Sequence, residues 1–397
     1  MDWDCFCLGG AALYLPLISM SEIAITPVCT QRERRVFLTF PWRIYRRDPL
    51  WVPPLLPERA RMIDPKRGKF FQDGYADLFI AWRGGKPVGT ISCAEDCAAT
   101  RARGYGECLI GFFECVEDYA VAEALFRQAE AWARQRNLLS LHGTYNLDRE
   151  ESRGILIEGR DRPAAVYCGY NPPYYAEFFE RYGFNKTGGD GLAYLISLDP
   201  TRPELQRLSR LAEKVRTRKS IRVRGANLDD MEAEIERIVD LQNRSLAHMP
   251  GFTPYTRAAI EAMVLPMVKV VDPELVLFAE VDGKPAGWFP AIPNLNEIFI
   301  HVNGLRYPWD YLRLLYWSRY TPKSIAIKSV VVPPEYWDTG VSILLFDEML
   351  KRAVSKGYQW ADLSLTGEDN PDTWPLAHRL GAKIYKRYRF YRKATTG

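Results

Sequence analysis

The sequence lacks several patterns by which well-known classes of protein are recognised. Its eight cysteines include no Cys-x-x-Cys pair, and they form no cluster with its four histidines at the spacing of zinc ligands. No segment after the amino terminus reaches about 18 uninterrupted apolar residues, the length that a membrane-spanning helix requires. We therefore predict a reduced, cytoplasmic protein that has neither a structural metal nor a spanning helix.

The amino terminus also lacks the pattern of an export signal. An apolar stretch ends at Met20, but Asp2 and Asp4 precede it where a signal peptide carries lysine or arginine. A domain-like pattern begins only at Glu22. Residues 1–19 are therefore predicted to be an appendage, with Met20 as an alternative start.

What the chain does contain is a repeat. The turn at Gly85 recurs at Gly283, and the helix end at Gly183 recurs at Gly381; both steps are 198 residues (283 − 85 and 381 − 183). Two landmarks at one offset indicate an internal duplication. With 397 residues, 47% of them hydrophobic, the chain can bury the cores of two domains.

The predicted domains are 20–200 and 225–397, with a basic linker at 201–224. In the first domain a hairpin at 78–92 leads to a strand at 109–113, a helix at 119–135 with apolar residues at helical spacing, and a strand at 138–142. A polar, charged insertion follows at 144–169. The second domain repeats this order, so an α/β fold is expected in both.

Several motifs resemble those of a known family. The order of elements, with Asn370 placed eleven residues before the helix-ending Gly381, resembles the GNAT superfamily of acyl-CoA N-acyltransferases. Both halves fit, so the chain resembles a tandem GNAT protein from about residue 22 to 395. A narrower resemblance, to a bacterial subgroup similar to bacterial ceramide synthases, rests on Phe40-Pro41-Trp42, Trp51-Val52-Pro53-Pro54, Gly111-Phe112-Phe113-Glu114, Tyr170-Asn171-Pro172-Pro173-Tyr174-Tyr175 and Lys386-Arg387-Tyr388.

This resemblance implies two tandem GNAT-like acyl-CoA N-acyltransferase domains, each a mixed central sheet flanked by helices. It also implies transfer of an acyl group from acetyl-CoA or a longer acyl-CoA to an amine, without a metal. The acceptor is expected to be a small-molecule or lipid-like amine, because bacterial ceramide synthases acylate a long-chain base. Two alternatives remain open: a catalytically silent binding or sensor protein, and a transferase that uses an aminoacyl-tRNA.

The CoA site is expected in the second half. GNAT enzymes bind the pyrophosphate on backbone N–H groups at a helix N-terminus, in a loop with the pattern Arg/Gln-x-x-Gly-x-Gly/Ala. The second half keeps Gly340 and the small Ser342, although Trp337 replaces the basic residue and Asp338 adds a negative charge. The first-half counterpart, 114–119, has no glycine and three acids, which repel phosphate. The predicted cofactor-binding residues are Val330, Val332, Trp337, Gly340, Val341, Ser342 and Asn370.

The catalytic candidates lie in the first half. The tyrosine that superfamily members often use as an acid is replaced by Phe179 in the first half and by Ala377 in the second. Glu114 ends an apolar strand, where partial burial would raise its pKa toward that of a useful base; an exposed acid or a helix cap is the alternative. His142 is a candidate base or proton relay, or else a hydrogen-bonded core histidine. Tyr175 is the candidate acid, with packing as its alternative.

The acceptor is expected beside the turn at 170–175 and the insertion before it. Tyrosines of the turn would form an aromatic wall, and carboxylates of the insertion would hold a cationic amine. Ordinary packing and a charged surface loop are the alternatives. The predicted substrate-binding residues are Tyr145, Asn146, Glu151, Tyr170, Asn171 and Tyr174.

Positive charge is concentrated in two segments. Residues 201–224 hold nine basic and two acidic side chains, and 379–393 hold seven basic and no acidic ones. Such regions suit anionic lipid, CoA phosphates or RNA. Nucleic acid is the least favoured of these partners, because no helix-turn-helix, RNP-like or zinc-finger pattern accompanies the charge. The aromatic, arginine-containing segment 309–320 is either an interfacial helix or a helix packed on its own domain, so peripheral contact with an anionic membrane, at its inner face, is predicted.

Overall fold

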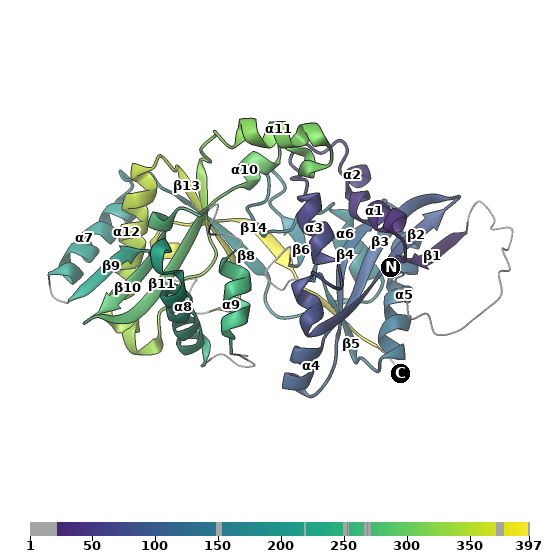
Figure 1. Ribbon diagram of the computed structural model, residues 1–397, viewed down its shortest axis with the longest axis horizontal. Helices are drawn as coiled ribbons and strands as arrows, with labels where there is room; N and C mark the ends of the chain where they lie inside the picture. The colour runs from purple at the N-terminus through teal and green to yellow at the C-terminus, as the bar shows by residue number, and fades with distance from the viewer. Residues whose placement is uncertain are drawn as a thin grey trace. The chain divides into compact units, whose positions relative to one another are not determined.

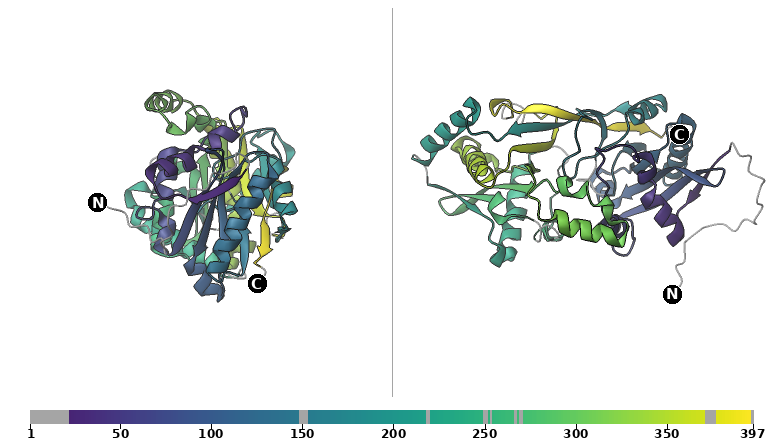
Figure 2. Two further views of the ribbon diagram at one scale, coloured as in Figure 1. Left: turned by 90° about the vertical axis from the view of Figure 1, so that its right-hand side faces the viewer. Right: turned by 90° about the horizontal axis from the view of Figure 1, so that it is seen from above.

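A computed structural model describes residues 22–147, 153–217, 220–248, 252, 254–265, 268, 271–370 and 377–395. These residues form two α/β units, each built on one mixed sheet that helices flank (Figures 1 and 2). The first unit comprises the described residues up to Leu156, Gly169–Thr187 and those from Arg389 onward; the second comprises Ile157–Cys168 and Gly188–Tyr388. The predicted appendage at 1–19 lies outside the described residues.

The sheet of the first unit runs β1-β2-β3-β4-β5-β15-β7. β2 and β3 form the predicted hairpin, because Gly84 and Gly85 take the positive φ values, 54° and 73°, that a tight turn requires. β4 and β5 are parallel, and the crossover helix α5 buries Val121, Leu125 and Ala129, as its pattern predicts. The elements are β1 (Ile23–Pro27), α1 (Gln31–Thr39), α2 (Pro41–Ile44), α3 (Leu56–Met62), η1 (Lys69–Gln72), β2 (Gly74–Arg83), β3 (Lys86–Asp96), α4 (Cys97–Arg103), β4 (Cys108–Cys115), α5 (Tyr119–Gln135), β5 (Ser140–Gly143), α6 (Tyr174–Arg181), β7 (Asn185–Lys186) and β15 (Tyr391–Ala394).

The sheet of the second unit runs β6-β14-β8-β13-β12-β11-β10-β9. The same order of hairpin, strand, crossover helix and parallel strand recurs in β10, β11, β12, α12 and β13, which agrees with the predicted duplication. The elements are β6 (Ile155–Glu158), β8 (Gly191–Ser197), α7 (Pro203–Arg216), β9 (Ile221–Gly225), η2 (Leu228–Asp230), α8 (Met231–Leu246), α9 (Arg257–Val264), η3 (Pro273–Leu275), β10 (Val276–Val281), β11 (Lys284–Pro293), α10 (Asn296–Phe299), η4 (Asn303–Leu305), α11 (Pro308–Trp317), β12 (Ser324–Ile327), η5 (Pro334–Thr339), α12 (Val341–Ser355), β13 (Trp360–Gly367) and β14 (Lys383–Arg389).

Each sheet contains a strand from the opposite half of the sequence. β15, near the carboxyl end of the chain, pairs with β5 in the first sheet. β8, which comes from the first half, pairs with β13 in the second sheet. In both sheets the exchanged strand lies beside the strand that follows the crossover helix. The two repeats are therefore linked by a reciprocal exchange of strands, which a simple tandem duplication does not predict.

The units differ from the predicted domains at the supposed linker. α7 and β9 occupy most of the segment 201–224, and both belong to the second unit. α7 buries Leu205, Leu208 and Ala212, so its basic residues form the outer face of an amphipathic helix. The insertion predicted at 144–169 is also divided, because Ile157–Cys168 belongs to the second unit.

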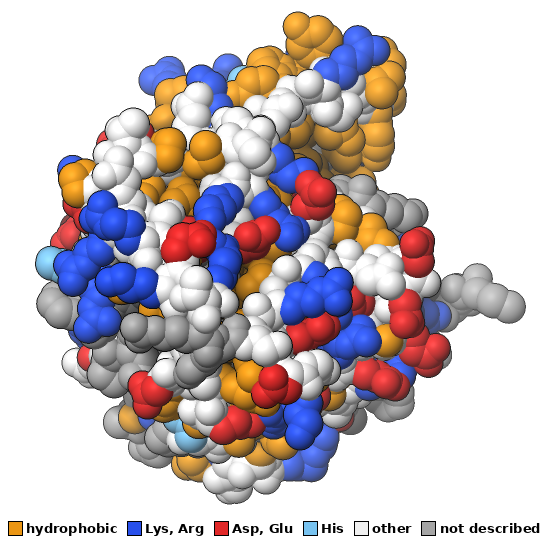
Figure 3. All heavy atoms as spheres, turned by 90° about the vertical axis from the view of Figure 1, so that its left-hand side faces the viewer, with side chains coloured by type: hydrophobic (Ala, Val, Ile, Leu, Met, Phe, Trp, Pro, Cys, Tyr) orange, Lys and Arg blue, Asp and Glu red, His pale blue; other side chains and the backbone are white. Residues whose placement is uncertain are grey.

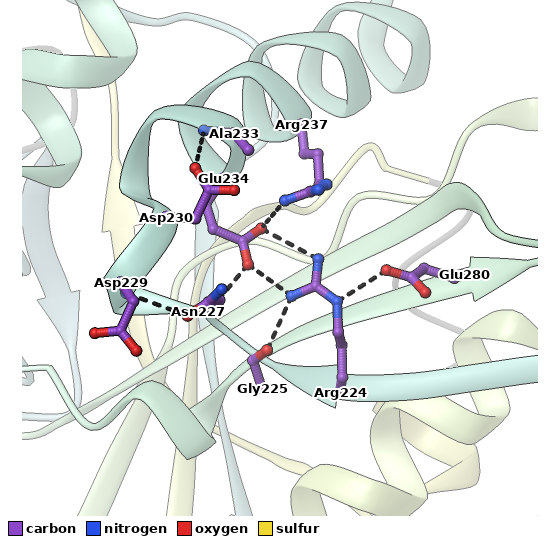
Figure 4. A network of polar contacts seen from close by, with 9 residues as sticks. All are labelled: Arg224, Gly225, Asn227, Asp229, Asp230, Ala233, Glu234, Arg237 and Glu280. Carbon is purple, nitrogen blue, oxygen red and sulfur yellow. Dashed lines mark hydrogen bonds and ion pairs between the residues drawn. The ribbon is translucent and has the colours of Figure 1, made fainter.

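A buried ion-pair network holds β9 in the second unit (Figure 4). The carboxylate of Glu234 on α8, only 1% exposed, accepts hydrogen bonds from Arg224 Nη1 at 2.6 Å and from the backbone N–H of Asn227 at 2.9 Å. Arg224 also pairs with Glu280 of β10 at 2.8 Å. Removing one partner would leave a buried charge unpaired, so the network stabilises the contact of β9 with α8 and β10.

Candidate functional site

The central strand β4 continues past the strand with which it pairs in parallel. The last residue pair between β4 and β5 joins Ile110 to Gly143, but β4 extends to Cys115. Beyond this point the pairing of β4 with β3 shifts register, and Phe112 takes a positive φ of 44°. Glu114 follows this irregularity, in the part of β4 that no longer pairs with β5.

The backbone before Glu114 is shaped by two residues of the first unit. Asn146 Oδ1 accepts a hydrogen bond from the backbone N–H of Phe112 at 2.7 Å. Gly111 lies so close to Tyr145 that a Cβ atom would come within 1.9 Å of the Tyr145 carbonyl oxygen. The structure thus gives Asn146 and Tyr145 backbone contacts with β4, and their predicted contact with substrate stays a prediction.

Two tyrosines donate hydrogen bonds to the carboxylate of Glu114. The hydroxyl of Tyr175 is 2.7 Å from Oε2, and the hydroxyl of Tyr45 is 3.0 Å from the same atom. The Tyr175 oxygen also accepts a hydrogen bond from the backbone N–H of Cys115 at 2.8 Å. Burial, together with the charge of Glu114, raises the pKa of both phenols well above the usual range. Both therefore remain protonated donors at neutral pH.

The pKa of the Glu114 carboxyl group is shifted as well. Burial raises its pKa to about 7, and the hydrogen bonds from Tyr175 and Tyr45 act in the opposite direction. The shift has the direction that the sequence predicts. A carboxyl group that titrates near neutral pH can accept a proton and release it again within one reaction cycle.

Tyr45 contributes to this site although no sequence motif singles it out. It stacks on Trp51 with ring centroids 4.8 Å apart, and its hydroxyl also lies 3.2 Å from the carbonyl oxygen of Tyr170. The Tyr170 hydroxyl donates to Asp48 at 2.8 Å. Trp51 is the first residue of the motif Trp51-Val52-Pro53-Pro54, and its ring covers one face of Tyr45.

His142 lies in a different cluster of the first unit. Its Nδ1 is 3.9 Å from Glu107 Oε2, and its Nε2 is 3.5 Å from the hydroxyl of Tyr145. Glu107 is 4% exposed and forms a further ion pair with Arg392 of β15 at 2.6 Å. The structure therefore brings Glu114 and Tyr175 together and gives His142 other partners, in keeping with the alternative of a hydrogen-bonded histidine.

Two further predicted substrate residues, Asn171 and Tyr174, belong to the turn at 170–175. Asn171 is buried, and its Oδ1 accepts a hydrogen bond from the backbone N–H of Leu156 at 2.8 Å, which anchors the turn. The Tyr174 hydroxyl donates to the carbonyl oxygen of Cys115 at 2.7 Å. Burial raises the pKa of Tyr174, so it also stays protonated. Glu151 lies outside the described residues.

The predicted phosphate loop precedes α12 in the second unit. Gly340, with a φ of 90°, is followed directly by Val341, and no side chain caps the helix. The corresponding helix of the first unit, α5, is capped by Asp118, whose Oδ1 accepts from the backbone N–H of Ala120 at 3.0 Å. An N-terminus without a side-chain cap suits an anionic ligand better than one that already holds a carboxylate.

The other predicted cofactor residues lie before α12, in its first turn and after it. The indole N–H of Trp337 donates to the carbonyl oxygen of Val332 at 2.8 Å. Ser342 and Val330 are half-buried. The backbone N–H of Asn370 donates to the carbonyl of Gly367 at 3.0 Å. The contacts of Trp337 and Asn370 therefore support the local backbone.

The second unit has no carboxylate at the position of Glu114. The first residue paired with the parallel neighbouring strand is Cys108 in β4 and Ser324 in β12. Six residues further along the chain lies Glu114 in the first unit and Val330 in the second (114 − 108 and 330 − 324). Of these two equivalent positions, both in the described part of the chain, only the one in the first unit carries a carboxylate.

A buried polar cluster lies beside this position in the second unit. Lys328 Nζ is 2.8 Å from Ser364 Oγ and 3.3 Å from Asp362 Oδ1, and the hydroxyl of Tyr385 donates to Asp362 Oδ2 at 2.6 Å. Cys168 Sγ is 3.0 Å from Ser364 Oγ, so the cluster connects the end of Ile157–Cys168 to β13. Within the described ranges, no group of three or more His, Cys, Asp or Glu side chains is placed to hold a metal ion.

Comparison with known proteins identifies the family. No model of a protein family matches the chain. The bacterial ceramide synthase of Caulobacter vibrioides is 30% identical over 380 residues, which cover 94% of this chain and 98% of that protein. This chain belongs to the bacterial ceramide synthase family. Protein YghO of Escherichia coli is similar to it too, with 26% identity over 371 residues, 91% of this chain and 93% of YghO.

The fold of this member of the bacterial ceramide synthase family is that of a tandem GNAT protein. A solved tandem GNAT protein from the clavulanic acid biosynthesis pathway superposes with a TM-score of 0.58 and 15% identity, over 95% of this chain and 99% of that chain. The predicted fold class, two GNAT-like domains of the N-acyltransferase type, is therefore confirmed. The predicted membership of a bacterial tandem GNAT subgroup close to ceramide synthases is confirmed as well.

Proposed function

We propose that this protein transfers an acyl group from a CoA thioester to the amine of a long-chain, amphiphilic acceptor, with Glu114 as the general base. The observation that carries the proposal is the carboxylate of Glu114, held by two tyrosine hydroxyls at the end of β4 with its pKa raised to about 7. Membership in the bacterial ceramide synthase family supports both the acyl transfer and the choice of a long-chain acceptor.

The chemistry requires one proton transfer at the amine. As the nitrogen of the neutral acceptor amine forms a bond to the thioester carbonyl carbon, one N–H proton passes to the Glu114 carboxylate, and the carbon–sulfur bond breaks to release the CoA thiolate. The proton held by Glu114 then passes to solvent or to the thiolate, which restores the base. A carboxyl group with an ordinary pKa would be a weaker base for this step, because it is almost fully ionised yet holds a proton poorly.

Tyr175 takes a positioning role in this proposal. Its hydroxyl donates to Glu114 and accepts from the backbone N–H of Cys115, so its proton is directed at the carboxylate. Its raised pKa makes it a poor acid for a leaving thiolate. Tyr45 has the same positioning role, because its hydroxyl donates to the same carboxylate oxygen.

For the CoA moiety, we retain the proposal that its phosphates lie at the N-terminus of α12. The uncapped backbone around Gly340, Val341 and Ser342 supports this proposal, whereas Asp338 opposes it. The base and this loop belong to different units, so separate variants test them. Ser342→Asp should raise the KM for acyl-CoA at least about tenfold with little change in kcat, because it brings a second carboxylate to the phosphates.

The proposed activity is tested with a long-chain acyl-CoA, acetyl-CoA and two amines, one with a long alkyl chain and one without. Amide product is measured by mass spectrometry, with reactions that lack protein or acceptor as controls. Amide formed with the long-chain amine is the expected result. Absence of amide in every combination, together with no calorimetric heat on adding either acyl-CoA, would contradict the proposal and favour a silent binding protein.

A further inference from the structure

The most exposed hydrophobic surface of the second unit lies on α11. Five large side chains of this ten-residue helix are at least half exposed, and Leu312, Leu315 and Tyr316 reach 69%, 62% and 67%. The other two are Trp309 and Tyr311. In the part of the chain that the structure describes, no helix is long and apolar enough to cross a bilayer. α11 instead presents apolar side chains along its outer surface.

These side chains form one continuous face. At about 100° per residue, Tyr311, Leu315, Leu312, Tyr316 and Trp309 follow one another around an arc of about 160°. Figure 3 shows this part of the surface at its upper right edge, where hydrophobic side chains gather with basic ones among them. Scattered apolar residues on a surface need no explanation, but a continuous helix face of this kind marks an interaction site.

The opposite side of α11 is attached through polar and ring contacts. Asp310 is fully buried, and its Oδ2 accepts hydrogen bonds from the backbone N–H of Tyr307 at 2.9 Å and from Asn303 Nδ2 at 3.2 Å. Trp317 stacks on His301 with ring centroids 3.7 Å apart. An amphipathic helix of a globular protein usually buries its apolar side, whereas α11 buries an acid and turns the apolar side outward.

The exposed charges next to this face are basic. Arg319 follows the helix and Arg313 lies at the edge of the apolar arc, and both are exposed; the half-buried Arg306 precedes the helix. The acid of the helix, Asp310, is buried and paired with Arg313 at 3.3 Å. Arginine, tryptophan and tyrosine around exposed leucines make up the composition of helices that lie in the interface of anionic membranes.

We propose that α11 docks this protein onto an anionic lipid surface, with Leu312, Leu315 and Tyr316 in the acyl boundary and the arginines at the headgroups. A second copy of the chain is a poorer occupant. In a symmetric dimer the same faces of two copies would meet, and the like charges of their arginines would oppose association. An anionic lipid surface instead supplies the opposite charge and adapts to a single helix.

The test is flotation of the full-length protein with vesicles of phosphatidylcholine alone or with about one third phosphatidylglycerol. Wild type should float with the anionic vesicles at low salt, and Leu312→Glu/Leu315→Glu should lower the partition coefficient at least about tenfold, since two apolar side chains are lost from the membrane. The matched control is Leu211→Glu on α7, which changes a leucine that is 41% exposed on another surface. It should float as wild type does.

The charge contribution is tested by Arg319→Gln, which should weaken binding to anionic vesicles about fivefold and leave binding to neutral vesicles unchanged. Unchanged circular dichroism and thermal unfolding verify that each variant is folded. No flotation of wild type, or equal flotation of wild type and the leucine double variant, would overturn the proposal. Suppose that wild type forms a dimer in sedimentation equilibrium, that the double variant is a monomer, and that wild type does not bind vesicles. That result would assign this face to self-association instead. Because none of these measurements uses acyl transfer, their outcome is independent of the proposed reaction.

Discussion

The pKa of Glu114 results from opposing effects within a few ångströms. Burial of the carboxylate raises it, while hydrogen bonds from Tyr175 and Tyr45 lower it by stabilising the charged form. The balance lies near pH 7, so each of the three side chains affects how much of the carboxylate is available as a base. We therefore expect a variant of the carboxylate to change the rate, and a variant of one tyrosine to change the pH at which the rate falls.

Glu114→Gln should lower kcat by about 10²–10⁴-fold under the proposed function, the usual contribution of a general base. In the wild type, kcat/KM should fall as the pH drops below about 7, because the base becomes protonated. The variant should lose this acid limb. Rates from pH 5.5 to 8.5 check both points, and circular dichroism verifies the fold. An unchanged rate would exclude Glu114 as the base and favour His142.

Tyr45→Phe tests the residue that sequence motifs miss. The ring and its stacking on Trp51 remain, but one hydrogen bond to the carboxylate is lost. The acid limb of kcat/KM should move up by about one pH unit, since a hydrogen bond to a charged group contributes about 1.5 kcal/mol. Tyr170→Phe, which removes a hydroxyl bonded to Asp48 instead, is the control. Equal pH profiles for Tyr45→Phe and wild type would mean that this contact does not set the pKa.

At the scale of elements, the pairing of β9 with the second unit depends on Glu234. Burial opposes its ionisation, but Arg224 and the backbone N–H of Asn227 lower its pKa below the ordinary value. A lowered pKa stabilises the fold at every pH above the ordinary value of 4.5, and this stabilisation is lost as the pH falls through the lower, folded-state pKa.

Glu234→Gln should therefore lower the free energy of unfolding by about 3 kcal/mol at pH 7, because Arg224 loses its buried partner. The difference between wild type and variant should shrink as the pH falls below about 4.5, where the carboxylate of the unfolded chain becomes protonated, and it should be lost as the pH falls through the lower pKa of the folded state. Urea unfolding at pH 7, 5 and 4 measures this. Glu232→Gln, on the exposed side of the same helix, is the control. A difference that stays constant with pH would contradict the linkage.

Local sequence patterns predict the elements well and their partners poorly. The apolar stripe of α5 and the glycine turns of both hairpins depend on neighbouring residues, so periodicity and turn chemistry suffice for them. The contact of Tyr175 with Glu114 spans 61 residues, and that of Tyr45 spans 69. The sequence shows which residue types are present, but the tertiary fold determines which of them are in contact. α7 was harder to predict for another reason: its charges dominate the composition, while Leu205, Leu208 and Ala212 form its buried face.

At the scale of the whole molecule, the strand exchange makes each repeat depend on the other half of the sequence. A repeat of 198 residues predicts two similar sheets, but nothing in its spacing tells which sheet the last strand of each half enters. β15 supplies Tyr391 to the core of the first unit, where its ring packs on Phe179 and its hydroxyl donates to Glu180 at 2.8 Å. The carboxyl end of the second half therefore completes the first core.

Truncation after Phe390, which removes β15, should destabilise the first unit by at least about 3 kcal/mol, because a buried aromatic ring and the pairing with β5 are lost together. Proteolysis under native conditions should then cut first within residues 22–147 and not within 188–388. Truncation after Thr395 keeps β15 and is the matched control. Tyr391→Ala tests the same core if the shorter chain is insoluble, and it should lower the unfolding midpoint in the same direction. If the truncated protein and the control unfolded alike, β15 would contribute pairing without stability, and the two halves would fold as independent repeats.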